Sequence, residues 1–266
     1  MEYERKKYPD GGIYATITNF SYPVITEKIN SYEDLFFIKS LKDICDHNGI
    51  DDVELVIPCL FQQQHDRRFN MKDSFELRII TDFINSCNFS KVHIFHPHSD
   101  VTGGLINKFW SIDNTKFILK VLDDIDHRTS EQPILLSTDG GSYKWINKLA
   151  DVIDFKGEVY GANKARNPET HKLFQTIDRE DFEGKNILIV DDICVYGGTF
   201  VGLAEMLKKR NVGKLFLAVS HMTVINPNSH LSLLYDQIYT TNSKYDDYEL
   251  ENLTVYNYPD PYKLYR

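Results

Sequence analysis

The sequence lacks the features that mark secreted and membrane-spanning proteins. Its opening residues, Met-Glu-Tyr-Glu-Arg-Lys-Lys, contain no apolar core of the kind that a signal peptide needs. No apolar run approaches the ~18 residues that a membrane-spanning helix requires. The four cysteines show no Cys-x-x-Cys spacing, and most of them lie in or beside apolar segments, which favours reduced thiols in a protein core. We therefore expect a cytoplasmic protein that does not associate with membranes.

Positive charge is scarce too. Lys and Arg number 30 against 39 Asp and Glu, and the net charge of −9 argues against long-range attraction to nucleic acid. A small phosphorylated ligand is not excluded, because local basic clusters and Mg²⁺ can neutralise its phosphates. The chain instead contains 42% hydrophobic residues, with 16 Tyr and 16 Phe, which predicts well-packed cores rather than disorder.

The length and the apolar pattern predict two domains of the same class. The 266 residues suit two domains of about 110–150 residues each. In the first half, strands and helices alternate and polar residues follow the strands; the pattern starts again near residues 112–116, without a Ser/Gly-rich linker. We expect two tandem α/β domains, 1–114 and 115–266, each with a doubly wound parallel sheet.

The expected elements can be placed by residue number. Residues 1–11 are polar and end in Pro-Asp-Gly-Gly, which predicts a tail or a tight turn. The expected strands are 13–20, 52–61, 92–95, 134–137, 158–161, 187–190, 214–219, 237–242 and an edge strand at 253–258. The expected helices are 31–48, with Ser31 as N-cap, then 74–87, 115–124, 143–151 and 200–210.

One stretch of the second domain combines several signals of a binding site. Ile187 to Val190 read as a buried strand, two carboxylates follow at Asp191 and Asp192, and a Gly-Gly-Thr turn opens a helix. A strand that ends in such a turn is where an open α/β sheet binds a ligand. The N–H groups at the helix start attract phosphate, and the acids can accept hydrogen bonds from sugar hydroxyls or hold a divalent metal. The stretch therefore predicts a site for a phosphoribosyl group.

This stretch resembles the ribose-phosphate loop of the type I phosphoribosyltransferase superfamily, which includes the phosphoribosyl pyrophosphate (PRPP) synthetases. Further segments resemble PRPP synthetases in the same order, from about residue 18 to residue 245. The resemblance implies that the acidic pair holds the ribose hydroxyls and that the following loop binds the 5-phosphate. The ribose-phosphate-binding residues that it implies are Asp191, Asp192, Val195, Tyr196, Gly197, Gly198 and Thr199.

A segment of the first domain resembles the ATP loop of the synthetases. An apolar strand runs into Gln64-His65-Asp66-Arg67-Arg68, and the family has Arg-Gln-Asp-Arg/Lys starting at the first of these positions. Two adjacent guanidinium groups suit a triphosphate, because they bind phosphate oxygens in pairs; the alternative is a solvated turn. Gln64 and His65 stand where the family usually has Arg and Gln, so one fixed charge is missing. The ATP-binding residues implied are Phe20, His65, Asp66, Arg67 and Arg68.

Two further segments resemble the parts of the family that lie near Mg²⁺. His98, in Phe-His-Pro-His-Ser, falls where the family has a histidine beside its Mg·ATP site. We expect His98 rather than His96 to face the site, because His98 stands at the position of the family's histidine, whereas His96 stands where the family has Asp. Asp139, in Ser-Thr-Asp-Gly-Gly, resembles the aspartate of the family's Ser/Ala-Pro-Asp-x-Gly-Gly loop, which helps to hold Mg²⁺ near the ribose. The resemblance thus implies Mg²⁺ as cofactor, with His98 and Asp139 as ligands.

Asn163-Lys164-Ala-Arg166 resembles the Lys-x-Arg segment at the root of the family's catalytic loop. Transfer of a diphosphoryl group spreads negative charge around the β-phosphorus, so catalysis depends on positioning and on cations. We expect Lys164, Arg166 and His98 to be catalytic. The polar run 167–183 would then be a lid that excludes water. The alternative is a basic surface turn.

The chain departs from the family inside the phosphate loop. PRPP synthetases usually have Asp/Ser-Thr before the Gly-Gly-Thr, whereas this chain has Val195 and Tyr196. Ribose recognition is kept while the 5′ end is altered, which suggests a 5′-substituted ribose such as ADP-ribose, with Tyr196 beside the substituent. The alternative is that Tyr196 points outward and ribose 5-phosphate still binds. The segment after Phe20-Ser21, where the family contacts adenine, also differs.

The leading hypothesis is a Mg²⁺-dependent diphosphokinase of the PRPP synthetase family, a divergent member that acts in nucleotide biosynthesis or NAD metabolism. It would move the β,γ-diphosphoryl group of ATP to the anomeric hydroxyl of ribose 5-phosphate or ADP-ribose, and we expect a homo-oligomer. A second hypothesis is a phosphoribosyltransferase that uses PRPP and a base. A third is a non-catalytic regulatory protein like the PRPP synthetase-associated proteins, but the retained Lys164, Arg166 and Asp139 argue against it.

Overall fold

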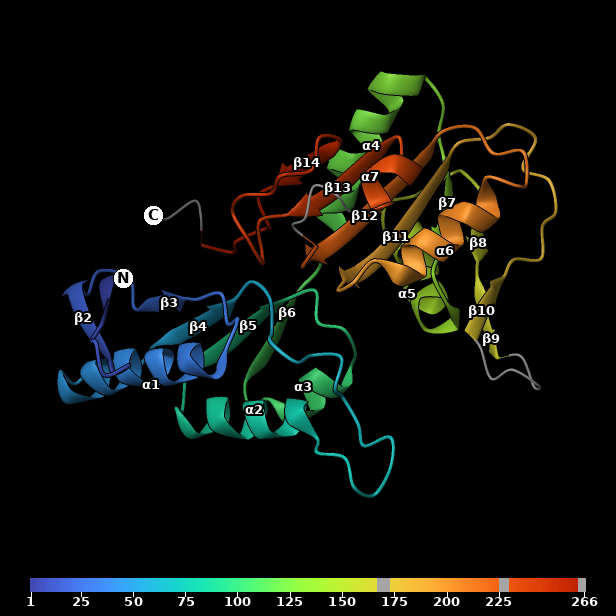
Figure 1. The fold of residues 1–266 in the computed structure, drawn as a ribbon. Helices are drawn as coiled ribbons and strands as arrows, with labels where there is room; N and C mark the ends of the chain where they lie inside the picture. The colour runs from blue at the N-terminus through green and yellow to red at the C-terminus, as the bar shows by residue number, and fades with distance from the viewer. Residues whose placement is uncertain (167–172, 225–229, 263–266) are drawn as a thin grey trace. The chain divides into compact units, whose positions relative to one another are not determined.

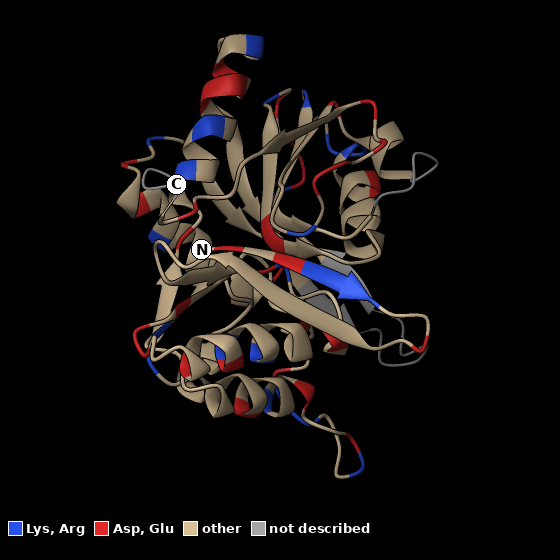
Figure 2. Cartoon of the chain, turned by 90° about the vertical axis from the view of Figure 1, so that its left-hand side faces the viewer, with Lys and Arg blue, Asp and Glu red and all other residues tan. Residues whose placement is uncertain are grey.

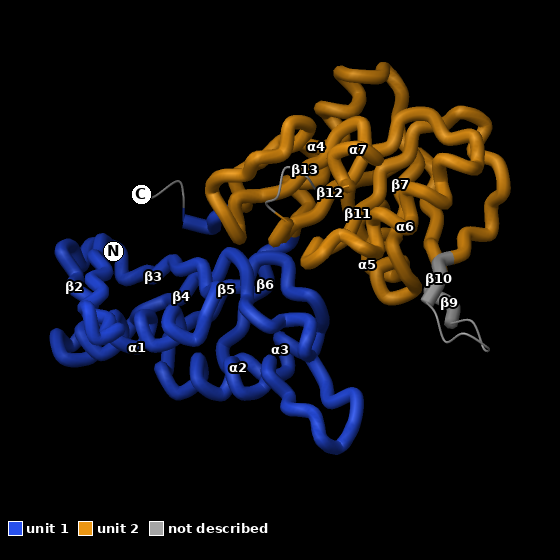
Figure 3. The backbone as a smooth tube through the Cα atoms, viewed as in Figure 1, with its two compact units in different colours: residues 1–113, 259–266 blue, residues 114–258 orange. Residues whose placement is uncertain are grey.

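The computed structural model describes residues 1–166, 173–224 and 230–262, with the backbone alone at 164–166 and 173–175. Figure 1 shows the order of helices and strands along the chain. The chain divides into two compact units, shown in Figure 3: unit 1 is Met1–Asp113 with Pro259–Arg266, and unit 2 is Asn114–Tyr258. The C-terminal residues from Pro259 onward therefore group with unit 1, whereas the sequence placed them in the second domain.

Unit 1 contains a four-stranded parallel sheet in the order β3-β4-β5-β6. Its strands follow one another across the sheet in chain order, and right-handed crossovers then place the connecting helices on one face. Figure 1 shows α1, α2 and α3 along the same side of this sheet. The strands are Val24–Thr26, Glu54–Ile57, Lys91–Phe95 and Phe109–Ile112, and the helices are Tyr32–His47, Glu76–Ser86 and Val101–Leu105.

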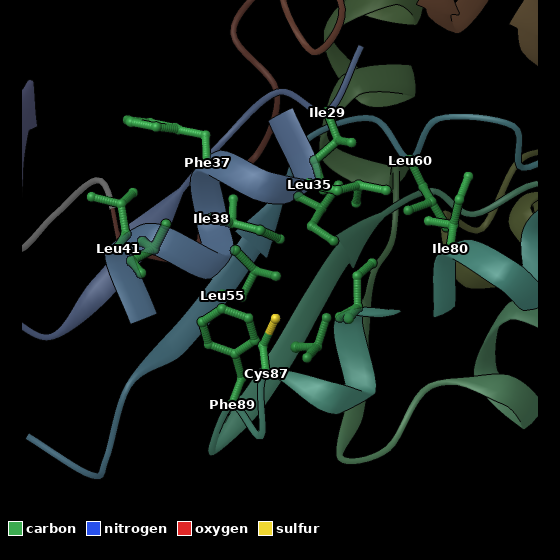
Figure 4. Packing of buried hydrophobic residues seen from close by; sticks show 14 of the residues in the cluster. Ile29, Leu35, Phe37, Ile38, Leu41, Leu55, Leu60, Ile80, Cys87 and Phe89 are labelled. Carbon is green, nitrogen blue, oxygen red and sulfur yellow. The ribbon is translucent and has the colours of Figure 1, made fainter. Parts of the chain in front are cut away.

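The core of unit 1 lies between these helices and the sheet. In α1, Ile38, Leu41 and Cys45 recur at helical spacing and are fully buried. They belong to one buried cluster with Leu55 of β4 and Ile80 of α2. Figure 4 shows part of this cluster, with Ile38 close to Leu55. The predicted start of α1 is confirmed, because Ser31 is the N-cap and its N–H donates to Asp34 Oδ2 at 2.8 Å.

An antiparallel hairpin precedes the sheet, formed by β1 (Glu2–Lys7) and β2 (Ile13–Asn19). The expectation of a tail or turn for residues 1–11 was wrong for the residues that form β1. Most residues of β1 are charged, so no alternation of apolar and polar residues indicates a strand there. Arg5 explains the strand: its guanidinium lies over the Phe37 ring at 4.8 Å and binds Glu33 and Asp34 at 2.7 and 2.6 Å. Figure 2 shows the acidic start and basic end of this strand next to the N-terminus.

Unit 2 contains a six-stranded parallel sheet in the order β14-β13-β12-β11-β7-β8. The edge position predicted for the last strand is confirmed, and the α/β class with parallel sheets is confirmed for the chain. In the order of the sheet, the strands are Leu253–Tyr256, Gln237–Thr241, Leu215–Met222, Ile187–Cys194, Ile134–Ser137 and Val159–Gly161.

Helices cover both faces of the unit 2 sheet. Alternate residues of β11 show this directly: Leu188 and Val190 pack in a core with α4 and α5, whereas Ile187 and Ile189 pack in a core with α6 and α7. The helices are Thr115–Thr129, Gly140–Val152, Gly198–Leu207 and His230–Leu234. A small antiparallel hairpin of β9 (Asn163–Arg166) and β10 (Leu173–Thr176) follows β8, and the sequence did not predict it.

The strand order of unit 2 fixes where a ligand can bind. From β7 the chain moves to β8 on one side, whereas β11 lies on the other side of β7 and the later strands continue in that direction. The crossover direction therefore reverses between β7 and β11, and open α/β sheets bind ligands at the carboxyl ends of such strands. In the described part of the chain, no helix has the length and apolar character needed to cross a membrane.

Candidate functional site

The phosphate loop predicted at residues 195–199 lies at this reversal point and opens α6. Gly197 is the N-cap of α6 and has a φ of +81°, in the left-handed region that favours glycine. The Thr223 hydroxyl fastens the loop, donating to the carbonyl oxygens of Val195 at 2.6 Å and Cys194 at 3.1 Å. Because the first N–H groups of a helix have no intrahelical acceptor, the start of α6 presents donors to an anion.

The two loop glycines serve different purposes. A Cβ on Gly197 would lie 3.0 Å from Leu231 Cδ1, whereas a Cβ on Gly198 would meet no atom within 4 Å. Gly197 is therefore required by the fold, and the open space at Gly198 leaves room for a ligand to approach the backbone.

Gly197→Ala is expected to lower the melting temperature by about 3–8 °C, because left-handed strain and the contact with Leu231 together cost about 1–3 kcal/mol. Gly198→Ala is the matched control and is expected to melt within about 1 °C of the wild type. Calorimetry of the three proteins measures this difference. Equal melting temperatures for both variants would contradict the assignment of Gly197 to the fold.

The acidic pair lies at the end of β11, inside the strand rather than after it. The sequence ended this strand at Val190, but β11 continues to Cys194, because it stays paired with β12 beyond the end of β7. The Thr138 hydroxyl donates to Asp191 Oδ2 at 2.5 Å, and the Asp192 N–H donates to Asp191 Oδ1 at 3.0 Å. Burial raises the pKa of Asp191 to about 8, and the charges of Asp192 and Asp139 add to the shift. Three carboxylates thus repel one another at this edge of the sheet.

Asp139 belongs to this acidic group and also starts a helix. It is the N-cap of α5, and its Oδ1 accepts hydrogen bonds from the N–H groups of Gly141 and Ser142, each at 3.0 Å. The sequence indicated a metal-binding role for Asp139 but not the cap, although an acid before a helical run is a common signal of an N-cap. It also missed Thr138, which stands where the PRPP synthetases have Pro and supplies a hydroxyl that Pro lacks.

The predicted ATP-loop residues lie in unit 1 between β4 and α2. Asp66 is buried, and Arg67 binds it through Nε at 2.7 Å and Nη2 at 3.1 Å, while the Arg67 side chain stays 65% exposed. This hydrogen-bonded pair lowers the pKa of Asp66. Arg68 is exposed and donates to the Asp73 carbonyl at 3.1 Å. His65 is exposed, and so is Phe20, at 37%.

The two histidines after β5 point to different environments. His96 is buried, with a positive φ of 41°, whereas His98 is exposed. The His98 N–H donates to Oε1 of the buried Gln63 at 3.0 Å, which joins this turn to the ATP loop. Gln63 is a residue that sequence reasoning passed over, and nothing in the local pattern distinguishes it from its neighbours Gln62 and Gln64.

Lys164 and Arg166 lie on β9, where they pair in register with Gln175 and Leu173 of β10. Residues two apart on a strand share a face, so the backbone places both side chains on the same side of the hairpin. Their side chains lie outside the described part of the structure, and so do residues 167–172 of the predicted lid. The described remainder of that run begins with β10 rather than with irregular chain.

The predicted metal ligands are not gathered by either unit alone. His98 belongs to unit 1 and Asp139 to unit 2. Among the residues that the structure describes, no group of three or more His, Cys, Asp and Glu side chains could hold a metal ion. A cation here would depend on few protein ligands, as Mg²⁺ does when substrate phosphates and water complete its shell.

Comparison with known proteins decides the family. Residues 111–255, a little over half of the chain, match the sequence model of the phosphoribosyl transferase domain. The chain belongs to the phosphoribosyl transferase domain family. The matched region contains the acidic pair, the phosphate loop and Asp139, so the family signature and the site geometry coincide.

Curated relatives extend the likeness beyond this phosphoribosyl transferase domain. The chain is 25% identical to a ribose-phosphate pyrophosphokinase of Methanobrevibacter smithii over 246 residues, covering 84% of the chain and 78% of the relative. It is 24% identical to that of Pyrococcus furiosus over 245 residues, covering 90% and 85%. The phosphoribosylpyrophosphate synthetase structure from Mycobacterium smegmatis matches with a TM-score of 0.79 at 15% identity, covering 96% of this chain and 86% of that one. The prediction of a divergent member with this fold is confirmed.

Proposed function

We propose that the chain transfers the β,γ-diphosphoryl group of ATP to the anomeric hydroxyl of a ribose 5-phosphate moiety. The observation that carries this proposal is the extent of the likeness: pyrophosphokinase relatives align with 84% and 90% of the chain, so both units take part. With such relatives, the chain is a diphosphokinase-type transferase. A phosphoribosyltransferase that uses PRPP and a base would leave the ATP loop of unit 1 without a purpose.

In unit 2, Asp191 and Asp192 accept hydrogen bonds from the ribose hydroxyls, and the backbone of Gly197 to Thr199 binds the 5-phosphate. The open space at Gly198 supports this role, because the phosphate needs close access to the helix start. The raised pKa of Asp191, about 8, supports a site that gains from hydroxyl donors and cations. Because the Thr223 hydroxyl donates to the Val195 carbonyl, the loop holds its conformation before the ligand binds.

In unit 1, Arg67 and Arg68 bind the triphosphate of ATP, and His65 and Phe20 lie along the nucleotide. Arg67 donates two hydrogen bonds to Asp66 through Nε and Nη2. Its side chain is exposed, and its Nη1 group can still contact phosphate. Asp66 therefore orients Arg67 rather than touching the nucleotide itself.

Mg²⁺ fits the residues present. The mutual repulsion of Asp191, Asp192 and Asp139 would be relieved by a divalent cation, and Asp139 supplies a hard oxygen donor beside the ribose site. His98, exposed at the end of β5, would serve on the nucleotide side. Bound Mg²⁺ would neutralise charge on the diphosphoryl group.

The reaction is an in-line displacement at phosphorus. The anomeric oxygen forms a bond to the β-phosphorus while the bond from that phosphorus to the α,β-bridging oxygen breaks; AMP leaves, and the hydroxyl proton passes to solvent or a nearby base. Lys164 and Arg166 stabilise the charge that develops on the transferred group, and His98 donates a hydrogen bond to it. Positioning and cations then supply most of the rate enhancement.

The acceptor is a ribose 5-phosphate whose phosphate carries a further group, such as ADP-ribose. The Tyr196 side chain is 94% exposed beside the phosphate loop, so it points outward, as the ribose 5-phosphate alternative expects; the ADP-ribose proposal requires a base to stack on this exposed ring. Plain ribose 5-phosphate gives that side chain nothing to contact.

With ATP as donor, kcat/KM is expected to be at least about tenfold higher for ADP-ribose than for ribose 5-phosphate, and Tyr196→Ala is expected to reduce this ratio by about 5–30-fold, the value of one base–aromatic stack. Tyr14→Ala, at a 52% exposed tyrosine of β2, is the control and should leave the ratio unchanged. Steady-state rates of AMP release measure both. A preference for the unsubstituted sugar would end the ADP-ribose proposal.

Product analysis tests the function itself. Incubation with ATP, Mg²⁺ and either sugar should release AMP, and the other two hypotheses predict different results. A phosphoribosyltransferase would consume PRPP and a base without ATP, and a non-catalytic subunit would release no AMP with either sugar. The homo-oligomer, the cytoplasmic location and a role in nucleotide or NAD metabolism remain predictions.

A further inference from the structure

The hairpin that carries Lys164 and Arg166 is joined to unit 2 by two short connections. On the entry side, β8 ends at Gly161 on the edge of the sheet, and the buried Ala162 donates its N–H to the Ser137 carbonyl at 3.0 Å. On the return side, the chain leaves β10 and runs through residues 177–186 to β11. The position of the hairpin therefore depends on how these two connections are held together.

Arg179, on the return side, binds the entry side directly. Its Nη1 group donates to Glu158 Oε2 at 2.7 Å and to the Tyr160 hydroxyl at 3.0 Å. The Tyr160 hydroxyl in turn donates to Glu158 Oε2 at 2.9 Å. Lys185 binds the other Glu158 oxygen at 2.5 Å. Glu158, just before β8, is thus shared by two cations of the return connection.

Arg179 is also held by packing. Its guanidinium lies 5.3 Å from the Tyr160 ring centroid and 5.1 Å from that of Phe182, and its side chain is only 14% exposed. Phe182 is fully buried in the core with α6. A guanidinium that lies close to two rings and is mostly buried has few alternative conformations, unlike an ordinary surface ion pair.

The return connection is also bound to Arg210, in the turn that follows α6. Arg210 Nη1 donates to the carbonyl oxygens of Ile177 at 2.7 Å and Arg179 at 2.5 Å, and the Phe182 N–H donates to the Arg210 carbonyl at 2.9 Å. The backbone of Arg179 is therefore fixed to the turn that follows α6, the helix whose start forms the phosphate loop. Because the Arg179 side chain also binds Glu158 and Tyr160, it holds the entry side of the hairpin in place.

We propose that Arg179 is a positioning residue, which through Glu158 and Tyr160 holds the root of the β9–β10 hairpin and so places Lys164 and Arg166 for reaction. The effect on catalysis rests on the proposed function, whereas the hold on the hairpin does not. The residue touches no substrate; it acts through the backbone of β8 and β9. When its hydrogen bonds and ring contacts are lost, the hairpin loosens, while the residues that bind ribose phosphate and ATP keep their positions.

Hydrogen–deuterium exchange tests the hold on the hairpin without any reaction. In Arg179→Met, the amides of 159–166 and 173–176 are expected to exchange about tenfold faster than in the wild type, while those of β11 and α6 stay unchanged. Glu158→Gln should give a similar change. Arg128→Met is the matched control, because Arg128 forms an ion pair with Asp124 at 2.5 Å on α4 of the same unit; its exchange in the hairpin should equal that of the wild type.

Kinetics test the consequence for catalysis. Arg179→Met is expected to lower kcat by about 10–100-fold, the cost of a misplaced catalytic group, with KM for both substrates within about threefold. Arg179→Lys, which keeps the charge, should recover part of kcat, and the Arg179→Met/Glu158→Gln double variant should be no slower than the worse single variant.

The outcomes separate the two proposals. Unchanged exchange in Arg179→Met would overturn the positioning role, even if the wild type is an active diphosphokinase. Faster exchange with kcat unaltered would also overturn it, because the hairpin would then not need Arg179 for reaction. Faster exchange in a protein whose wild type releases no AMP from ATP would leave the hold on the hairpin intact and contradict the proposed function.

Discussion

Lys164→Ala should lower kcat by about 10²–10⁴-fold while changing KM for ATP by less than about threefold. The reason lies in where charge appears: the diphosphoryl group gains charge around its phosphorus only as the reaction proceeds, and a lysine on the hairpin meets it there. In the proposed function, bound ATP is instead held by the arginines of unit 1. Removal of Lys164 therefore costs transition-state stabilisation and little ground-state binding.

Steady-state kinetics with varied ATP measure this split. Lys148→Ala is the control, since Lys148 is an exposed lysine of α5 in the same unit, and its kinetics should equal those of the wild type. A Lys164→Ala enzyme with normal kcat and a KM for ATP raised a hundredfold would show that Lys164 binds nucleotide and has no special role in the transition state.

Asp191→Asn should make the protein more stable at high pH and almost inactive. The folded protein holds the pKa of Asp191 at about 8, whereas an unfolded aspartate has a pKa of about 3.9. The proton is thus bound more tightly in the folded state, so stability is greatest below pH ~4 and falls as pH rises towards 8. Asparagine cannot ionise and escapes this loss, which we expect to be a few kcal/mol by pH 9.

Melting temperatures between pH 5 and pH 9 test this expectation. The variant should exceed the wild type by about 5–10 °C at pH 9 and by only a small margin at pH 5, where the wild-type carboxyl is protonated. Asp123→Asn, at a 76% exposed carboxylate of α4, should follow the wild-type curve. A constant difference across the pH range would show that Asp191 titrates normally. If Asp191→Asn is folded but releases no AMP, the buried carboxyl group is needed for function rather than for folding.

The sequence predicted the region from β11 to α6 well, because several independent patterns coincide there. A β-branched run, an acidic pair, a double glycine and an amphipathic helix each constrain the same few residues. The core strands and the longer helices were found for the same reason, since burial on one or two faces leaves a periodic signal along the chain. The parallel sheets and the family likeness follow from those patterns.

What the sequence did not predict depends on contacts between distant residues. The strand β1 reads as a charged tail, and its pairing with β2 and the contacts of Arg5 with α1 explain why it is ordered. The hydrogen bonds from Thr138 to Asp191 and from Arg179 to Glu158 likewise join residues far apart in the sequence, so local periodicity does not predict them. These contacts decide which charges are paired and which remain available for ligands.

The central claim is that both units serve one transfer of a diphosphoryl group from ATP to a ribose carbon-1 oxygen. Phosphorus NMR of the protein with ATP, Mg²⁺ and ADP-ribose, and separately with ribose 5-phosphate, tests it most directly. We predict that AMP resonances grow together with those of a diphosphate attached to the anomeric carbon, in equal amounts and without ADP. Formation of ADP or inorganic phosphate, or unchanged ATP with both sugars, would contradict the claim.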